Sequence, residues 1–315
     1  MKKHLGNSLE QIAESIRLSV NLLEKELGQV SEIETLNKPQ PSLLQQCDQL
    51  IEADQNKKET IRTIHHFACT GGTLFTKCLA SMPNTLILSE VEPQSTIPPK
   101  SLFTPTDLIQ LLRKSTRHPS KALISNVFLS GLGVIQDSCK RRGLHLILRD
   151  HSHSKYCYGD IDQKAPTLLK TVAAQHRTLS VITVRHPLDS YLSLATKNWL
   201  HFHPVTVEEY AKRYLKFLND NKGIKVFKYE DLIENSGDTI RGICDELKLP
   251  YFSGFEDVFG VHIVSGDSGR TSNLIGKRER REIPEKVKSE FATGPLPTFH
   301  ELCRILGYRD VLWLD

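Results

Sequence analysis

Two adjacent glycines near residue 70 could hold an anionic group of a ligand. Gly71 and Gly72 follow an apolar run, and a helical pattern begins directly after them. Two glycines let the backbone approach an anion closely, and free N–H groups at the start of a helix point toward it. We therefore predict an anion-binding turn in which Gly72, Thr73 and Leu74 donate from their N–H groups. An ordinary tight strand–helix turn is the alternative for this segment.

A second segment joins an arginine to a serine at helical spacing. Arg185 ends an apolar run, Pro187 is typical of the first turn of a helix, and Ser193 lies eight residues after Arg185. A guanidinium and a hydroxyl placed in this way could hold one phosphate, the arginine through charge-assisted hydrogen bonds. A purely structural helix start is the plainer interpretation.

A third group of side chains could perform acid–base chemistry. Arg149 and His151 follow the apolar run 144–148, and Glu90 follows the run 85–88. A histidine can accept a proton near neutral pH, and a fixed cation can stabilise a developing negative charge. The histidine could instead have a structural role at a strand end, and the glutamate could be a solvated loop acid. His151 and His153 could begin a metal site, but no third ligand is evident, so we predict no metal.

The pattern around these residues predicts an α/β fold from residue 61 onward. Short runs rich in Ile, Val, Leu and Thr alternate with helical patterns, which requires crossover connections and a mostly parallel sheet with helices on both faces. Ligands bind at the carboxyl ends of the strands in such sheets. The expected strands are 61–67, 85–88, 144–148, 179–184 and 224–229. The expected helices are 104–116, 120–141, 187–200, 206–220 and 238–248.

The N-terminal part of the chain has a different pattern. Residues 8–28 repeat apolar side chains at spacings of three and four, and a second helical stretch is expected at about 42–54. We predict an N-terminal helical extension, residues 1–58, and an α/β domain, residues 59–315. The helices either pack on the main body or form a homodimer with a second copy, and the sequence leaves the oligomeric state open.

The composition excludes several classes of protein. The 315 residues contain 39 % hydrophobic residues and carry a formal net charge of +4, which excludes intrinsic disorder and argues against a nucleic-acid partner. The seven cysteines have no metal-site spacing, so we expect reduced thiols and a cytoplasmic location. The N-terminus is too polar for a signal peptide, and we expect no membrane span.

The two anion-binding segments together resemble the sulfotransferase family that uses 3′-phosphoadenosine 5′-phosphosulfate (PAPS). The matching features are a Gly-Gly-Thr turn and, downstream, Arg-x-Pro-x-Asp-x-x-x-Ser after a buried strand. The resemblance implies a P-loop-like sheet whose glycine turn, with Thr70, Gly71, Gly72, Thr73 and Leu74, holds the 5′-phosphosulfate. It also implies that Arg185 and Ser193 hold the 3′-phosphate.

Three further segments extend the resemblance over roughly residues 61–285. Tyr229 begins a Tyr-Glu-Asp-Leu segment whose tyrosine lies near the adenine in the family, and Arg270 lies in a glycine-rich stretch that matches a basic loop over the 3′-phosphate. Arg149 and His151 stand where cytosolic members have Lys-Thr-His, whose histidine is the base. Glycan- and protein-modifying members use a glutamate near Glu90, so the choice of base stays open.

One departure from the family pattern concerns the glycine turn. Many members carry a lysine there, and Thr70 stands at that place. Arg149, or Lys77 in the helix that follows, could supply the missing positive charge.

The resemblance implies an enzyme that moves a sulfuryl group from PAPS to a hydroxyl or amine of a small molecule or glycan, without a metal. Residues 92–142 and 194–215 are expected to shape the acceptor pocket, and the acceptor is left open. One alternative is a P-loop kinase-like phosphotransferase, although the chain lacks the G-x-x-x-x-G-K-[ST] motif. Another is a non-catalytic nucleotide-binding or scaffold protein.

Overall fold

The computed structural model describes residues 14–15, 17–21, 42–46, 60–98, 104–266, 274–277 and 281–309. The contacts divide the chain into two units, Met1–Lys57 and Lys58–Asp315. Residues 14–15, 17–21 and 43–46 of the first unit are helical. The rest of the two predicted N-terminal helices lies outside the described residues, so a homodimer through these helices stays a prediction.

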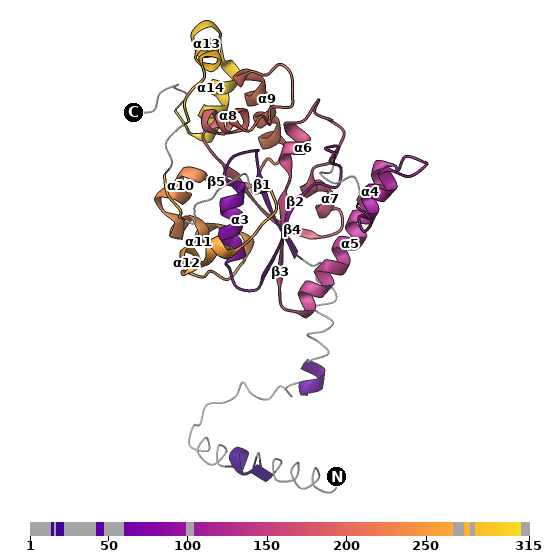
Figure 1. Cartoon of the computed structure of the whole chain (residues 1–315). Coiled ribbons are helices and arrows are strands. Elements are labelled where there is room, and N and C mark those ends of the chain that lie inside the picture. Colours follow the sequence, from indigo (N-terminus) through magenta and orange to yellow (C-terminus); the bar gives the residue numbers. More distant parts are fainter. Residues whose placement is uncertain are drawn as a thin grey trace. The chain divides into compact units, whose positions relative to one another are not determined.

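The second unit is built around a five-stranded sheet in the order β2-β3-β1-β4-β5 (Figure 1). Every neighbouring pair of strands is parallel, which confirms the predicted α/β class. The observed strands are β1 (Thr60–His66), β2 (Thr85–Val91), β3 (His145–Asp150), β4 (Arg177–Val184) and β5 (Lys225–Lys228). Each agrees with a predicted run to within a few residues.

Helices cover both faces of the sheet (Figure 1). The side chains of α3 and α11 form one buried apolar cluster with β1 and β4, and those of α5 and α7 form another with β1 and β3. The helices of the second unit are α3 (Gly72–Ala80), α4 (Leu108–Arg113), α5 (Lys121–Arg141), α6 (Ser152–Tyr156), α7 (Leu168–Ala173), α8 (Pro187–Thr196), α9 (Val207–Asp220), α10 (Tyr229–Glu234), α11 (Ser236–Leu247), α12 (Phe255–Val258), the 3₁₀ helix η1 (Phe259–Val261), α13 (Glu285–Thr293) and α14 (Pro297–Leu306).

A third apolar cluster lies beyond the carboxyl end of β1. Phe67 stacks on Tyr214 of α9, with ring centroids 4.4 Å apart and planes 10° from parallel. Both side chains are fully buried. Because Phe67 directly precedes the glycine turn, this packing fixes the point at which the chain leaves the sheet.

Among the described residues, one helix is long and apolar enough to cross a membrane by length and composition alone. It is α5, and the expectation of no membrane span stays a prediction. Leu129, Leu132 and Cys139 of α5 belong to the buried cluster against β1 and β3. The helix therefore also has the apolar face that packing on a sheet requires.

Candidate active site

All five strands contribute to one cavity at the carboxyl end of the sheet. Its volume is about 750 Å³. Parallel strands end at the same edge of a sheet, so residues that follow different strands meet there. The lining residues at or just after the strand ends include His66 (β1), Glu90 (β2), Arg149 and His151 (β3), Arg185 (β4) and Tyr229 (β5).

The two glycines of the turn lie against aromatic rings. Gly71 has φ 88°, and a Cβ there would lie 2.3 Å from Cδ2 of Tyr229. A Cβ on Gly72 would lie 2.4 Å from Cδ2 of His66. Both positions therefore need glycine, for backbone conformation at the first and for close approach at both.

The N–H groups of this turn differ from the prediction in one respect. The N–H of Leu74 donates to the carbonyl of Gly71 at 2.9 Å, so it is not available to a ligand. Within the part of the chain that the structure describes, no acceptor is found for the N–H groups of Gly72 and Thr73. An anion here would be bound by two backbone donors at the start of α3 rather than three.

Thr70 does not line the cavity, contrary to the prediction. Its hydroxyl is buried and donates to the carbonyl of Phe67 at 2.7 Å. The preceding residue, Cys69, has φ 62° and lines the cavity instead. Because the backbone at Cys69 is left-handed, the next residue, Thr70, points into the turn. Its hydroxyl stabilises the loop there.

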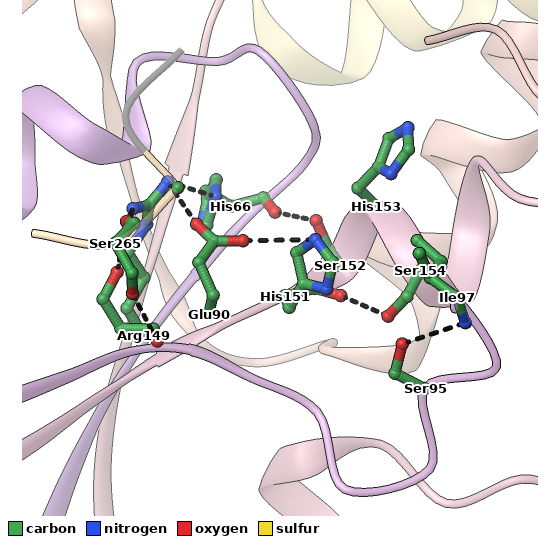
Figure 2. Close-up of polar contacts among 12 residues, drawn as sticks. His66, Glu90, Ser95, Ile97, Arg149, His151, Ser152, His153, Ser154 and Ser265 are labelled. Carbon is green, nitrogen blue, oxygen red and sulfur yellow. Dashed lines mark hydrogen bonds and ion pairs between the residues drawn. The ribbon is translucent and has the colours of Figure 1, made fainter. Parts of the chain in front are cut away.

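Arg149 places a fixed cation beside the turn (Figure 2). One terminal nitrogen, Nη2, lies 3.2 Å from Oγ1 of Thr73 and 2.9 Å from Oε1 of Glu90. The other, Nη1, donates to Oγ of Ser89 and to the carbonyl of Ser265, both at 3.0 Å. These contacts hold a 3 % exposed guanidinium in one place. Of the two candidates for the missing positive charge, Arg149 lines the cavity and Lys77 does not.

Glu90 and His151, the two candidate bases, contact each other (Figure 2). Nε2 of His151 lies 3.2 Å from Oε2 of Glu90. Burial lowers the pKa of His151, with Asp150 opposing this effect and Arg149 adding to it. Burial also raises the pKa of Glu90, which Arg149 counteracts. A neutral imidazole that donates from Nε2 to Glu90 keeps Nδ1 unprotonated, so His151 can accept a proton at Nδ1.

The second predicted anion site lies at another part of the same cavity. The guanidinium of Arg185 lies 4.8 Å from the ring centroid of Tyr229, the ring that also covers Gly71. Ser193 lines the cavity from α8, as the spacing predicted. No ion pair to Arg185 is found among the described residues, and Arg185 lines the cavity.

Two basic residues that the sequence analysis did not assign also line the cavity. They are Lys197, one helical turn beyond Ser193, and Arg281, from the basic run 277–281. Both lie close enough to Cys69, with Arg185, to oppose the rise that burial causes in the pKa of its thiol. Arg270, the predicted basic-loop residue, lies outside the described residues. Helical periodicity from Ser193 could have identified Lys197.

The described residues include no group of three or more His, Cys, Asp or Glu side chains arranged to hold a metal ion. The predicted absence of a metal therefore stays a prediction. His151 and His153 have ring centroids 6.1 Å apart.

Comparisons with known proteins give matches only at the level of structure. No protein-family model and no curated protein matches the chain. Solved structures that are similar include the sulfotransferase domain of the curacin biosynthetic pathway, with 16 % identity, a TM-score of 0.47, and coverage of 81 % of this chain and 99 % of that one. The fold is similar to that of sulfotransferases.

Two further similar structures are also sulfotransferases. The sulfotransferase domain of the Synechococcus PCC 7002 olefin synthase has 16 % identity, a TM-score of 0.43, and coverage of 80 % of this chain and 96 % of that one. Mouse sulfotransferase SULT7A1, complexed with PAP, has 11 % identity, a TM-score of 0.40, and coverage of 81 % and 89 %. Similarity at these sequence identities concerns the fold alone, so the roles of the side chains are argued from the site itself.

Proposed function

We propose that this cavity binds PAPS and transfers its sulfuryl group to a hydroxyl or amine of an acceptor. The observation that carries the proposal is that the glycine turn and the Arg185–Ser193 pair line one cavity together with His151. PAPS has anionic groups at both ends of its ribose, which suits two separate anion sites in one cavity. A nucleoside triphosphate has its charges in a single chain and would leave the second site empty.

The contacts support a definite orientation of the nucleotide. The N–H groups of Gly72 and Thr73 and the guanidinium of Arg149 would bind the 5′-phosphosulfate, because Arg149 already contacts the hydroxyl of Thr73 at 3.2 Å. Arg185 and Ser193, together with Lys197 and Arg281, would bind the 3′-phosphate. Tyr229 contacts Gly71 on one side and Arg185 on the other, so its ring would lie beside the nucleoside that joins the two groups.

His151 is the base in this proposal, and Glu90 positions it. The acceptor oxygen or nitrogen attacks sulfur in line, its proton passes to Nδ1 of His151, and the bond from sulfur to the bridging phosphate oxygen breaks. The products are the sulfated acceptor and 3′,5′-bisphosphoadenosine. Arg149 stabilises the negative charge that develops on the leaving phosphate oxygen. Glu90 accepts the Nε2–H of His151 and so keeps Nδ1 free for the proton.

Nucleotide binding tests the proposal without knowledge of the acceptor. We expect 3′,5′-bisphosphoadenosine to raise the melting temperature of the protein in a thermal-shift assay, and Arg185→Ala to abolish this increase because the 3′-phosphate loses its main cation. Arg241→Ala is the matched control. Arg241 also lies over a tyrosine, with its guanidinium 4.3 Å from the ring centroid of Tyr251, and it does not line the cavity.

Three results would contradict the proposed function. An increase that Arg185→Ala and Arg241→Ala leave equally intact would place the nucleotide elsewhere. Stabilisation by ATP with Mg²⁺, but not by 3′,5′-bisphosphoadenosine, would favour the phosphotransferase alternative. If the nucleotide binds as expected but PAPS is never consumed with any acceptor, the non-catalytic alternative holds.

A further inference from the structure

Four flat side chains line the cavity beyond the residues assigned to the nucleotide. We call this group the ring wall; it consists of His153, Tyr158, Trp199 and His201. One of them borders the nucleotide site, because Nζ of Lys197 lies 5.2 Å from the ring centroid of Trp199. Figure 2 places His153 and Ile97 on one side of His151, and Glu90 with Arg149 on the other. The ring wall therefore begins next to the proposed base, on the side away from the glycine turn.

The ring wall is held together by contacts between two segments far apart in sequence. His153 Nε2 donates to the carbonyl of Trp199 at 3.0 Å, and the N–H of Gly159 donates to the carbonyl of His201 at 2.7 Å. The ring of His153 lies 5.8 Å from those of both Trp199 and His201, and the ring of Tyr158 lies 5.6 Å from that of His201. These contacts hold the two segments together, so the rings lie side by side without a ligand.

The ring wall has no negative charge. Among the described residues that line the cavity, the single acid is Glu90, which contacts Arg149 and His151 instead. Burial lowers the pKa of His153 to about 4, so this imidazole is neutral at neutral pH. A pocket of flat rings without an acid, and with one proton acceptor at its inner end, is suited to a flat apolar ligand with a single polar group.

We propose that the ring wall is the acceptor subsite and that the acceptor is an aromatic hydroxyl compound. Its ring would pack against Trp199 and its neighbours, and its hydroxyl would reach His151. This inference rests on the proposed function. In the reaction the aryl oxygen forms the new bond to sulfur and loses its proton to His151. The bond from sulfur to the bridging phosphate oxygen breaks, so the products are an aryl sulfate and 3′,5′-bisphosphoadenosine.

Binding of 2-naphthol tests the subsite directly. We expect calorimetric titration to detect 2-naphthol in the presence of 3′,5′-bisphosphoadenosine, and neither 1-hexanol nor glucosamine at the same concentrations. Trp199→Leu removes the ring but retains an apolar side chain, so it should weaken 2-naphthol binding on the order of tenfold. Trp199→Phe should restore most of the affinity. Phe252→Leu, which alters an exposed aromatic residue outside the cavity, should have no effect.

The emission of Trp199 locates the bound ligand. The chain contains two tryptophans, Trp199 and Trp313, so Trp313→Phe leaves Trp199 as the sole tryptophan, which is excited selectively at wavelengths that the tyrosines do not absorb. We expect 2-naphthol to quench that emission in a saturable manner with the same dissociation constant as the titration. Saturable binding that does not quench Trp199 would overturn the inference, because the ligand would lie elsewhere.

The remaining outcomes separate the subsite from the proposed function. Glucosamine or 1-hexanol binding more tightly than 2-naphthol, or an unchanged affinity in Trp199→Leu, would overturn the aromatic acceptor and leave nucleotide binding untouched. If 2-naphthol binds at Trp199 while 3′,5′-bisphosphoadenosine fails to stabilise the protein, the aromatic subsite stands and the proposed function fails.

Discussion

At the scale of single residues, Glu90 has the most unusual position in the cavity. Its backbone has φ 64°, in the left-handed region, where β2 has an irregular register between Leu88 and Val91. A non-glycine residue in this conformation costs on the order of 1–2 kcal/mol. The conformation directs the carboxylate to Arg149 and His151, and the two contacts offset the strain. Strain of this kind is typical of positions where a side chain must point in one direction.

The first prediction concerns the pKa of His151. Burial already lowers it from its ordinary value of 6.5. Glu90→Gln removes the negative charge that faces His151 and leaves the positive charge of Arg149 uncompensated, so the pKa of His151 should fall further. The proposed reaction needs the neutral imidazole, so activity should fall as the pH drops through this pKa, and the fall should move to lower pH in Glu90→Gln. Titration of the histidine resonances by NMR measures the pKa directly, with His151→Ala for the assignment.

A second carboxylate provides the control for this experiment. Glu92 lies two residues away and is also half-buried, with its pKa raised to about 7 mainly by loss of solvent, but it does not line the cavity. Glu92→Gln should leave the titration of His151 in place. An unchanged pKa in Glu90→Gln would show that the contact seen here does not act on the imidazole. His151→Ala itself should lower the rate of sulfuryl transfer by roughly 10²–10⁴-fold, as expected for loss of a general base.

At the scale of elements, the turn from β1 to α3 determines the shape of the nucleotide site. Tyr229, at the start of α10, lies so close to Gly71 that no side chain fits between them. The turn and the beginning of α10 are therefore coupled through one ring, although they are far apart in sequence. A change in the turn should alter the nucleotide site and the packing of Tyr229 together.

Substitution of glycines by alanine separates the two reasons why this turn needs glycine, which are the positive φ of Gly71 and its close approach to Tyr229. Gly143 has φ 65° with nothing within 4 Å of a Cβ, so Gly143→Ala should cost only backbone strain, about 1 kcal/mol in the free energy of unfolding. Gly71→Ala adds a clash with Tyr229 and should cost roughly 2 kcal/mol or more. Urea denaturation measures both values. Stabilisation by 3′,5′-bisphosphoadenosine should be lost in Gly71→Ala alone, and its survival there would contradict the assigned role of the turn.

The strands could be predicted from the sequence more completely than the turns. Apolar runs of four to seven residues are sufficient to identify parallel strands, and all five were predicted. The extension of β2 through Ser89 and Glu90 was not, because polar residues break the run and the register shift has no sequence signal. The inward direction of the Thr70 hydroxyl was not predicted either, since it depends on the left-handed backbone at Cys69, an arrangement that residue types alone do not reveal.

At the scale of the whole molecule, the cavity joins segments whose proximity only the fold creates. Trp199 and His201, from the range 194–215 predicted to shape the acceptor pocket, line the cavity, and their contact with an acceptor stays a prediction. Tyr158 was not predicted, because it reaches the cavity through its backbone bridge to His201. Arg281 was not predicted either. Long-range pairing of this kind follows from tertiary contacts and leaves no local pattern.

The last prediction concerns the N-terminal extension. All described residues that line the cavity belong to the unit Lys58–Asp315, so a chain that begins at Lys58 should bind 3′,5′-bisphosphoadenosine with the affinity of the full chain. Calorimetric titration of both chains tests this, and light scattering after gel filtration gives their masses. A dimeric full chain and a monomeric shortened chain would support pairing through the N-terminal helices. A shortened chain that folds but no longer binds the nucleotide would contradict the proposed separation, because residues before Lys58 would then contribute to the site.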